Sequence, residues 1–168
     1  MAARFCVQCG TKLVRRSVEH RFRNVCLKCG HIAFRNAKPA VGLLIERDDR
    51  LLLVRRARAP FEGYWDIPGG FLEAEESPEK GAVREAREET GLRVKVDELL
   101  GAYHGTSGDD YTLNLYYTAH VIGGREKAGD DASAMRWFAV AEVPTRIAFP
   151  GHTRHVIRDW LRGRTGTR

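Results

Sequence analysis

The hydrophobic positions of the chain first form a recurring strand pattern about a quarter of the way along it. Residues 40–45 are a continuous apolar run of the kind suited to a buried strand. A polar turn at residues 48–50 separates this run from a second one at residues 51–54, which predicts a second strand. Residues 65–67 predict a third, short strand that ends at the Pro-Gly-Gly of residues 68–70.

The pattern then changes to that of a helix. Ser77 and Pro78 are typical of an N-cap and a first helical position, and Gly91 is typical of the position that closes a helix. The helix is therefore predicted to run to Thr90. Its apolar side consists of Ala82, Val83 and Ala86.

The rest of the chain predicts further strands and a last helix. Strand patterns occupy residues 92–103, 113–122 and 135–140, and they are separated by turns rich in Gly and Asp. Residues 152–161 predict a terminal helix. This order predicts an α/β (α+β) domain with a mixed sheet over residues 37–168.

All four cysteines precede this domain, within residues 1–36. They form two Cys-x-x-Cys pairs, Cys6 with Cys9 and Cys26 with Cys29, and a glycine follows each pair. Such spacing predicts a zinc ribbon with a closed, tetrahedral and structural Zn²⁺ site. Two disulfides or a redox-active pair are the alternatives, but a reducing compartment disfavours the first and the second matched pair disfavours the other.

Charge separates the two parts of the chain in the same way. The net charge is +6, and residues 1–36 carry eight basic residues against one acidic residue, whereas the remainder is close to neutral. The first part is thus a candidate surface for phosphates or nucleic acid, with a merely solvated basic surface as the alternative. No apolar run approaches membrane-spanning length, and no apolar signal core opens the sequence, so we expect a cytoplasmic protein without a membrane partner.

Three glutamates of the predicted helix carry the candidate chemistry. Glu85 lies three residues before Glu88 and four residues before Glu89. Residues at these spacings are neighbours on a helix surface, so the three carboxylates lie on one side of the helix. Mg²⁺ or Mn²⁺ would neutralise their repulsion, activate water and stabilise charge on a diphosphate. Arg84 is placed to pair with Glu88 and with Glu76. A solvated, glutamate-rich helix is the alternative interpretation.

Residues 70–92 match the Nudix box at every defined position, from Gly70 through Glu76 and Arg84-Glu85 to Gly91-Leu92. The chain therefore resembles Nudix hydrolases over roughly residues 37–145. The resemblance implies a mixed sheet sandwiched by helices. It also implies Mg²⁺ or Mn²⁺ ligation by Glu85, Glu88, Glu89 and the Gly70 carbonyl, with Glu85 as a candidate base. Asp131, or its neighbour Asp130, is a weaker candidate for a further catalytic acid.

Together with the ribbon, the chain is similar to the bacterial zinc-ribbon Nudix proteins of the NADH pyrophosphatase and ADP-ribose pyrophosphatase group. This resemblance implies hydrolysis of ADP-ribose, NADH, FAD or a sugar nucleotide to a nucleoside monophosphate and a phosphorylated remainder, and it suggests a homodimer. The Ser-Gln-Pro-Trp-Pro-Phe-Pro array of NADH-cleaving members is missing after Leu92. The alternatives are a non-catalytic nucleotide sensor and an RNA-cap hydrolase whose ribbon binds nucleic acid.

Substrate contacts are expected just before the helix. Basic and aromatic side chains there can hold phosphate and stack a base. The candidates are Arg55, Arg58, Phe61, Trp65, Gly69 and Gly70, with Arg56 and Tyr64 beside them. Core packing is the favoured interpretation of Trp65, and we expect His152 and His155 to cap and pack the last helix.

Overall fold

The chain divides into two compact units, Met1–Ala37 and Lys38–Arg168. The computed structural model describes residues 3–108, 110–129 and 131–165. In the first unit, β1 (Val14–Val18) and β2 (Arg21–Val25) form an antiparallel pair. β3 (Ile32–Ala33) adds a third strand beside β2, too short to leave a pattern in the sequence. The small core contains Cys6, Leu13 and Cys26.

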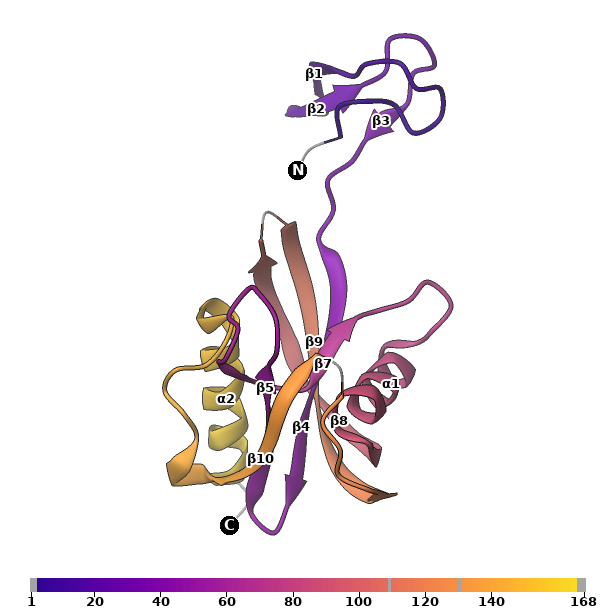
Figure 1. Cartoon of the computed structure of the whole chain (residues 1–168). Helices are drawn as coiled ribbons and strands as arrows, with labels where there is room; N and C mark the ends of the chain where they lie inside the picture. Colours follow the sequence, from indigo (N-terminus) through magenta and orange to yellow (C-terminus); the bar gives the residue numbers. More distant parts are fainter. Residues whose placement is uncertain (1–2, 109, 130, 166–168) are drawn as a thin grey trace. The chain divides into compact units, whose positions relative to one another are not determined.

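The second unit is built on one seven-stranded mixed sheet (Figure 1). The main order is β10-β5-β4-β9-β8, with β6 beside β5 and β7 beside β4. β4 and β9 run parallel, whereas the other pairs are antiparallel. The strands are β4 (Lys38–Arg47), β5 (Arg50–Arg56), β6 (Trp65–Asp66), β7 (Gly69–Phe71), β8 (Leu92–Ser107), β9 (Asp110–Gly124) and β10 (Ala132–Ala139).

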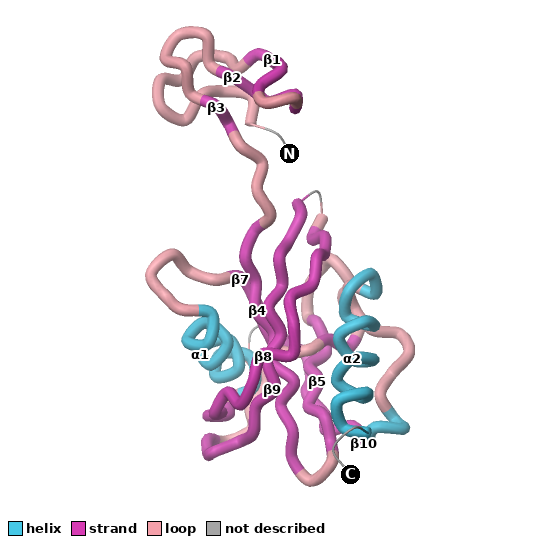
Figure 2. The backbone as a smooth tube through the Cα atoms, turned by 180° about the vertical axis from the view of Figure 1, so that it is seen from behind, coloured by secondary structure: helices cyan, strands magenta, loops and turns pink. Residues whose placement is uncertain are grey.

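Helices cover both faces of this sheet, α1 (Pro78–Thr90) on one side and α2 (Pro150–Thr165) on the other (Figures 1 and 2). Alternate residues of β4 point to opposite faces, so Leu43 packs in the core under α1 and Leu44 in the core under α2. Both faces need apolar side chains, and for this reason the run at residues 40–45 is continuous rather than alternating. The predicted sandwich of helices around a mixed sheet is confirmed.

The ends of α1 follow the predicted local chemistry. The Ser77 Oγ accepts a hydrogen bond from the Lys80 amide at 3.4 Å, and Pro78 occupies the first turn. At the other end Gly91 adopts a left-handed conformation, and its N–H donates to the Arg87 carbonyl. Local residues thus form hydrogen bonds with backbone groups at both ends of α1.

Several strands and the last helix extend beyond their predicted bounds, most clearly β8 and β9. β8 and β9 pair along 13 positions, out to Ser107 opposite Asp110, because backbone hydrogen bonding continues through polar residues that show no apolar alternation. A 3-10 turn, η1 (Val140–Glu142), leads towards α2, which begins at Pro150. None of the helices in the described part of the chain is long and apolar enough to span a membrane.

Candidate active site and cysteine cluster

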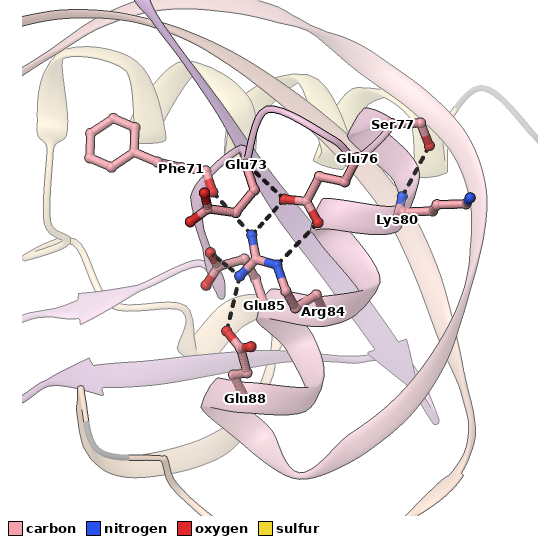
Figure 3. A network of polar contacts seen from close by, with 8 residues as sticks. All are labelled: Phe71, Glu73, Glu76, Ser77, Lys80, Arg84, Glu85 and Glu88. Carbon is pink, nitrogen blue, oxygen red and sulfur yellow. Dashed lines mark hydrogen bonds and ion pairs between the residues drawn. The ribbon is translucent and has the colours of Figure 1, made fainter.

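Arg84 connects α1 to the loop before it (Figure 3). Its Nε and Nη2 atoms donate to both carboxylate oxygens of Glu76, at 3.1 and 2.7 Å. Its Nη1 donates to Glu85 at 2.9 Å and to Glu88 at 3.0 Å, and its Nη2 also donates to the Phe71 carbonyl. These bonds from Arg84 hold the pKa of Glu76 down at about 2. The predicted pairs with Glu88 and Glu76 are present, and Glu85 is held as well.

Glu85 lies directly against the backbone of Gly70. A Cβ atom placed on Gly70 would come within 2.3 Å of the Glu85 Oε1, closer than real Cβ contacts. A residue with a side chain at this position would therefore displace the carboxylate. Burial raises the pKa of Glu85, although Arg84 opposes this effect. The Pro-Gly-Gly turn and α1 thus form one assembly around a half-buried carboxylate.

Glu89 and Asp66 add two more carboxylates with restricted access to water. The Glu89 Oε2 accepts a hydrogen bond from the Gly69 amide at 2.9 Å. Burial, together with the charges of Glu85 and Asp66, raises the pKa of Glu89 to about 8. Burial also raises the pKa of Asp66 to about 7, against the effect of Arg56, whose Nη1 lies 3.4 Å from the Asp66 Oδ2. The site therefore holds more buried negative charge than its neighbouring cations offset.

This donor set fits a hard divalent cation. Carboxylate and carbonyl oxygens are the ligands that Mg²⁺ and Mn²⁺ prefer, and a cation would relieve the electrostatic cost of the buried carboxylates. The Glu88 side chain is 59% exposed and bonded to Arg84, so it lies at the rim of the site. In the described part of the chain, no three carboxylates gather as closely as the cysteine sulfurs do. Arg84 instead lies between Glu85 and Glu88.

One cavity of about 460 Å³ is lined by these carboxylates and by basic side chains. Glu85, Glu89, Arg56, Arg58 and Asp131 all contribute to its wall. The Asp131 Oδ1 lies 3.0 Å from the Arg58 Nη1, and the Asp131 side chain is 65% exposed. The structure thus places Asp131 at the mouth of this cavity, while Asp130 lies outside the described residues. A polyanionic group in the cavity would meet Arg56 and Arg58.

The substrate-contact candidates from the sequence divide into two groups. Gly69 and Gly70 line the carboxylate cavity with Arg58, and Phe61 lines a neighbouring one. Arg55 instead donates to the Gly63 carbonyl at 3.0 Å, and it is absent from the walls of both cavities. Trp65 packs edge-to-face on Phe138, 4.9 Å between ring centroids, in the core under α2. The core-packing interpretation of Trp65 is therefore the one that the contacts favour.

Asp66 is a residue of this site that the sequence analysis did not single out. It appeared there only as part of a short strand, and its burial depends on β5 and on the packing of the sheet. The signal available was a single acidic residue between Trp65 and Ile67, both apolar. A charged residue within an apolar run is costly to bury, and it marks a candidate for function.

The four cysteines of the first unit converge on one point. The Cys6–Cys29 and Cys9–Cys26 sulfur atoms lie 3.5 Å apart, Cys9–Cys29 are 3.6 Å apart, and all four sulfurs lie within 4.8 Å of one another. A tetrahedral zinc site with Zn–S bonds of about 2.3 Å separates its sulfur atoms by about 3.8 Å, so the cluster has the right size. No disulfide joins these thiols.

The two cysteine turns share one backbone conformation. The Gly10 amide donates to the Cys6 carbonyl and the Gly30 amide to the Cys26 carbonyl, each at 2.9 Å. Both glycines have positive φ, +70° and +75°, in the region that side chains disfavour. The glycine after each pair thus allows the tight turn that the two cysteines share.

Comparison with known proteins assigns the family. A family model described as the NUDIX domain matches residues 36–160. The chain belongs to the Nudix hydrolase family. The carboxylates on α1 and the Pro-Gly-Gly turn are therefore parts of a diphosphate-hydrolysing enzyme, as its resemblance to the Nudix box implied.

The relatives of this Nudix hydrolase match different portions of its chain. It is 40% identical over 132 residues to an ADP-ribose pyrophosphatase of Methanocaldococcus jannaschii, which covers 76% of each protein. It is 31% identical over 163 residues to the NAD-capped RNA hydrolase NudC of Pseudomonas aeruginosa, covering 97% of this chain but 57% of the relative. The second similarity therefore includes the cysteine unit.

A solved structure matches almost the whole chain. The crystal structure of a Nudix hydrolase from Nitrosomonas europaea superimposes with a TM-score of 0.87 at 30% identity. The match covers 99% of this chain and 94% of the other. The arrangement of a small cysteine unit before a Nudix domain thus has a structural counterpart.

Proposed function

We propose that this Nudix hydrolase cleaves the diphosphate linkage of a nucleoside diphosphate derivative, ADP-ribose foremost, to a nucleoside monophosphate and a phosphorylated remainder. The observation that supports this proposal is the cavity that Glu85 and Glu89 line together with Arg56 and Arg58. The acidic groups suit a cation, and the guanidinium groups suit phosphate oxygens. The similarity to an ADP-ribose pyrophosphatase favours this substrate class.

Each side chain has a proposed task in this reaction. When bound by Glu85, Glu88, Glu89 and the Gly70 carbonyl, Mg²⁺ or Mn²⁺ would supply Lewis acidity and lower the pKa of water. Glu85 accepts a proton from the attacking water, and Arg84 holds the Glu85 carboxylate towards the cavity.

Four further groups complete the proposed site. Arg56 and Arg58 bind the non-bridging phosphate oxygens, and Asp131 holds Arg58 at the cavity mouth. The Gly69 amide fixes one oxygen of Glu89, and the other oxygen would serve as a ligand of the cation.

The cysteine cluster is proposed as a structural zinc site. Cys6, Cys9, Cys26 and Cys29 supply four sulfur ligands, which leave no open coordination position for chemistry. The core of this unit is so small that Zn²⁺ would contribute most of its folding free energy, on the order of 10 kcal/mol.

The proposed function is tested with purified protein and added Mg²⁺ or Mn²⁺. ADP-ribose, NADH, FAD, UDP-glucose and nucleoside triphosphates are offered in parallel, and the products are identified by chromatography and mass spectrometry. Glu85→Gln and Glu89→Gln should each lower kcat by at least about 100-fold, in the range seen for general-base groups. Glu98→Gln, at an exposed position of β8, is the matched control. Undiminished turnover in folded Glu85→Gln and Glu89→Gln proteins would contradict the assignment.

Hydrolysis at a capped RNA end is the second candidate function, and a feature of the first unit favours it. Arg16 and Arg23 stand directly opposite each other in the β1–β2 pair, and the exposed Glu19 carboxylate, 4.0 Å from the Arg23 Nη2, offsets their repulsion only weakly. The Arg23 guanidinium stacks on Phe34 at 4.6 Å, and its buried Nε has no hydrogen-bond partner among the described residues. Phe34 and Phe22 are 56% and 70% exposed. Exposed rings beside guanidinium groups suit single-stranded RNA.

The two candidates differ in the salt dependence of RNA binding. Fluorescence anisotropy of the full chain with a short single-stranded RNA gives the affinity at several salt concentrations. Arg16→Ala should weaken binding and reduce the slope of log affinity against log salt by about one. Lys95→Ala, at an exposed position of β8, is the control. An affinity and slope unchanged by Arg16→Ala and by Phe34→Ala would exclude this surface.

A further inference from the structure

A second cavity adjoins the carboxylate cavity on the far side of the Pro-Gly-Gly turn. It has a volume of about 150 Å³ and shares Arg56, Asp66 and the Gly69–Gly70 backbone with the carboxylate cavity. At its other end it shares Phe149 and His152 with a third, wider cavity of about 560 Å³. The three cavities therefore follow one another along the protein, from the carboxylates of α1 to the first turn of α2.

Two buried polar side chains in the second cavity have unused hydrogen-bonding capacity. Asn114 is 7% exposed and His152 is 6% exposed. The Asn114 Nδ2 donates to the Tyr103 carbonyl at 3.1 Å and to the Thr112 Oγ1 at 2.9 Å, but its Oδ1 accepts nothing from the described residues. The His152 ring also forms no hydrogen bond with any described residue. Buried polar groups are normally paired, so both side chains are suited to a ligand.

The second cavity is shaped so that these two side chains reach it together. A Cβ atom on Gly105 would come within 2.5 Å of the His152 Nδ1 and within 2.7 Å of the Asn114 Nδ2. The absence of a side chain at Gly105 is therefore what allows both groups to meet over β8. Burial, together with the nearby His104 and His155, lowers the pKa of His152, which favours the neutral ring with one donor and one acceptor.

Aromatic rings form the walls beyond these polar groups. Phe149 stacks on His152 at 6.0 Å between ring centroids, and Phe61 meets Phe149 edge-to-face at 5.0 Å. Phe61 and Phe149 both have positive φ, +65° and +47°, which is unusual for bulky residues. Such backbone strain clusters at ligand sites, where the surrounding structure holds it in place. Two strained phenylalanines that pack on each other at this opening form an aromatic wall against which a planar ligand can lie.

We propose that the second cavity, here called the base pocket, holds the heteroaromatic base of the substrate, and that Asn114 selects a base with an exocyclic amino group. The amide hydrogens of Asn114 are occupied by Tyr103 and Thr112, so only its Oδ1 acceptor is free for a ligand N–H. A cavity of about 150 Å³ holds a benzene-sized ring, and a second ring would extend towards Phe149. The inference rests on the proposed function only in placing the diphosphate beside Glu85 and Glu89.

The test compares ADP-ribose with its hypoxanthine analogue, in which a carbonyl oxygen replaces the exocyclic amino group. The wild-type chain should prefer ADP-ribose by at least about 10-fold in kcat/KM, because the analogue leaves the buried Asn114 Oδ1 facing another acceptor. Asn114→Ala should bring the ratio of the two kcat/KM values close to one. This ratio does not depend on the fraction of enzyme that is folded. Arg154→Ala, at an exposed position of α2 outside the second cavity, should keep the wild-type ratio.

A second variant and a binding measurement complete the test. Gly105→Ala should raise KM for ADP-ribose with a smaller effect on kcat, because the added Cβ displaces Asn114 and His152. Calorimetry without divalent cation should show AMP binding at least several-fold more tightly than IMP, with the difference lost in Asn114→Ala.

Each outcome decides one of the two proposals. Equal kcat/KM for both substrates in the wild type, or equal loss for both in Asn114→Ala, would overturn the base pocket and leave the hydrolase assignment standing. No cleavage of either substrate with Mg²⁺ or Mn²⁺ would overturn ADP-ribose as the substrate in the proposed function. In that case the comparison of AMP with IMP would still decide the base pocket.

Discussion

Replacing Gly70 by alanine should inactivate the enzyme without unfolding it. The added Cβ would lie 2.3 Å from the Glu85 Oε1 and 2.5 Å from its Cδ, whereas ordinary contacts begin at 3.4 Å. The backbone of Gly70 is held by pairing with Val41 in β4, so the side chain of Glu85 must give way. The carboxylate would have to move by about 1 Å to regain a 3.4 Å contact.

A shift of this size is large for a reacting group. A displacement of about 1 Å costs a catalyst about 100-fold in rate, which corresponds to about 2.7 kcal/mol in the activation free energy. We therefore expect kcat/KM for ADP-ribose to fall by about 100-fold in Gly70→Ala. The melting temperature should change by only a few degrees, because the contact lies at a half-buried, flexible side chain rather than in the core.

The assay measures kcat/KM with saturating Mg²⁺ alongside thermal unfolding. Gly163→Ala is the matched control, since a Cβ there meets nothing within 4 Å. That change should leave kcat/KM unaltered and stabilise α2 by up to about 1 kcal/mol, the difference between Gly and Ala in a helix. Wild-type kcat/KM in Gly70→Ala would refute the reasoning.

A double-mutant cycle tests whether the effect passes through Glu85. Glu85→Asp withdraws the carboxylate by one methylene group and should itself lower kcat/KM. If the two changes act through the same contact, the double variant should lose less activity than the sum of the two single losses in free energy. Strictly additive losses would show that Gly70→Ala acts elsewhere.

Three other changes probe the remaining parts of the structure. Arg84→Met should lower kcat/KM by about 10–100-fold and reduce the melting temperature, because Glu76 and Glu85 lose their common partner. If both kcat/KM and the melting temperature stay unchanged, Arg84 does not orient these carboxylates. Cys26→Ser, or a strong chelator, should release one zinc per chain and unfold the first unit while the melting transition of the second persists; a dye assay for free zinc and circular dichroism measure both. Asp66 binds its proton more tightly in the folded state, with a pKa of about 7 against 3.8, so the free energy of unfolding should fall as pH rises from about 4 to 7. In metal-free urea titrations at several pH values, Asp66→Asn should remove this part of the dependence of the unfolding free energy on pH. The same pH dependence in Asp66→Asn and in the wild type would refute this role of Asp66.

The local elements of this protein follow from its sequence because their signals are local. Ser77, Pro78 and Gly91 satisfy the ends of α1 within a few residues of themselves. The two Cys-x-x-Cys-Gly turns likewise fold by short-range hydrogen bonds, and Glu85 and Glu89 share a side of α1 because they are one helical turn apart. The spacing of residues 70–92 was sufficient to predict the reaction class.

Long-range packing determined which side chains line the cavities, because the spacing of residues along the sequence does not specify this. The sequence could not show that Arg55 turns away while Arg56 reaches the cavity, since both lie on one strand and differ only in the face they occupy. Nor could it show that Asn114 of β9 and His152 of α2 line one cavity and approach each other beside Gly105 of β8. Their contact depends on sheet order and on where α2 packs. The sequence alone thus determined the spacing of the carboxylates proposed to react, whereas the tertiary structure determined which side chains line the cavities around them.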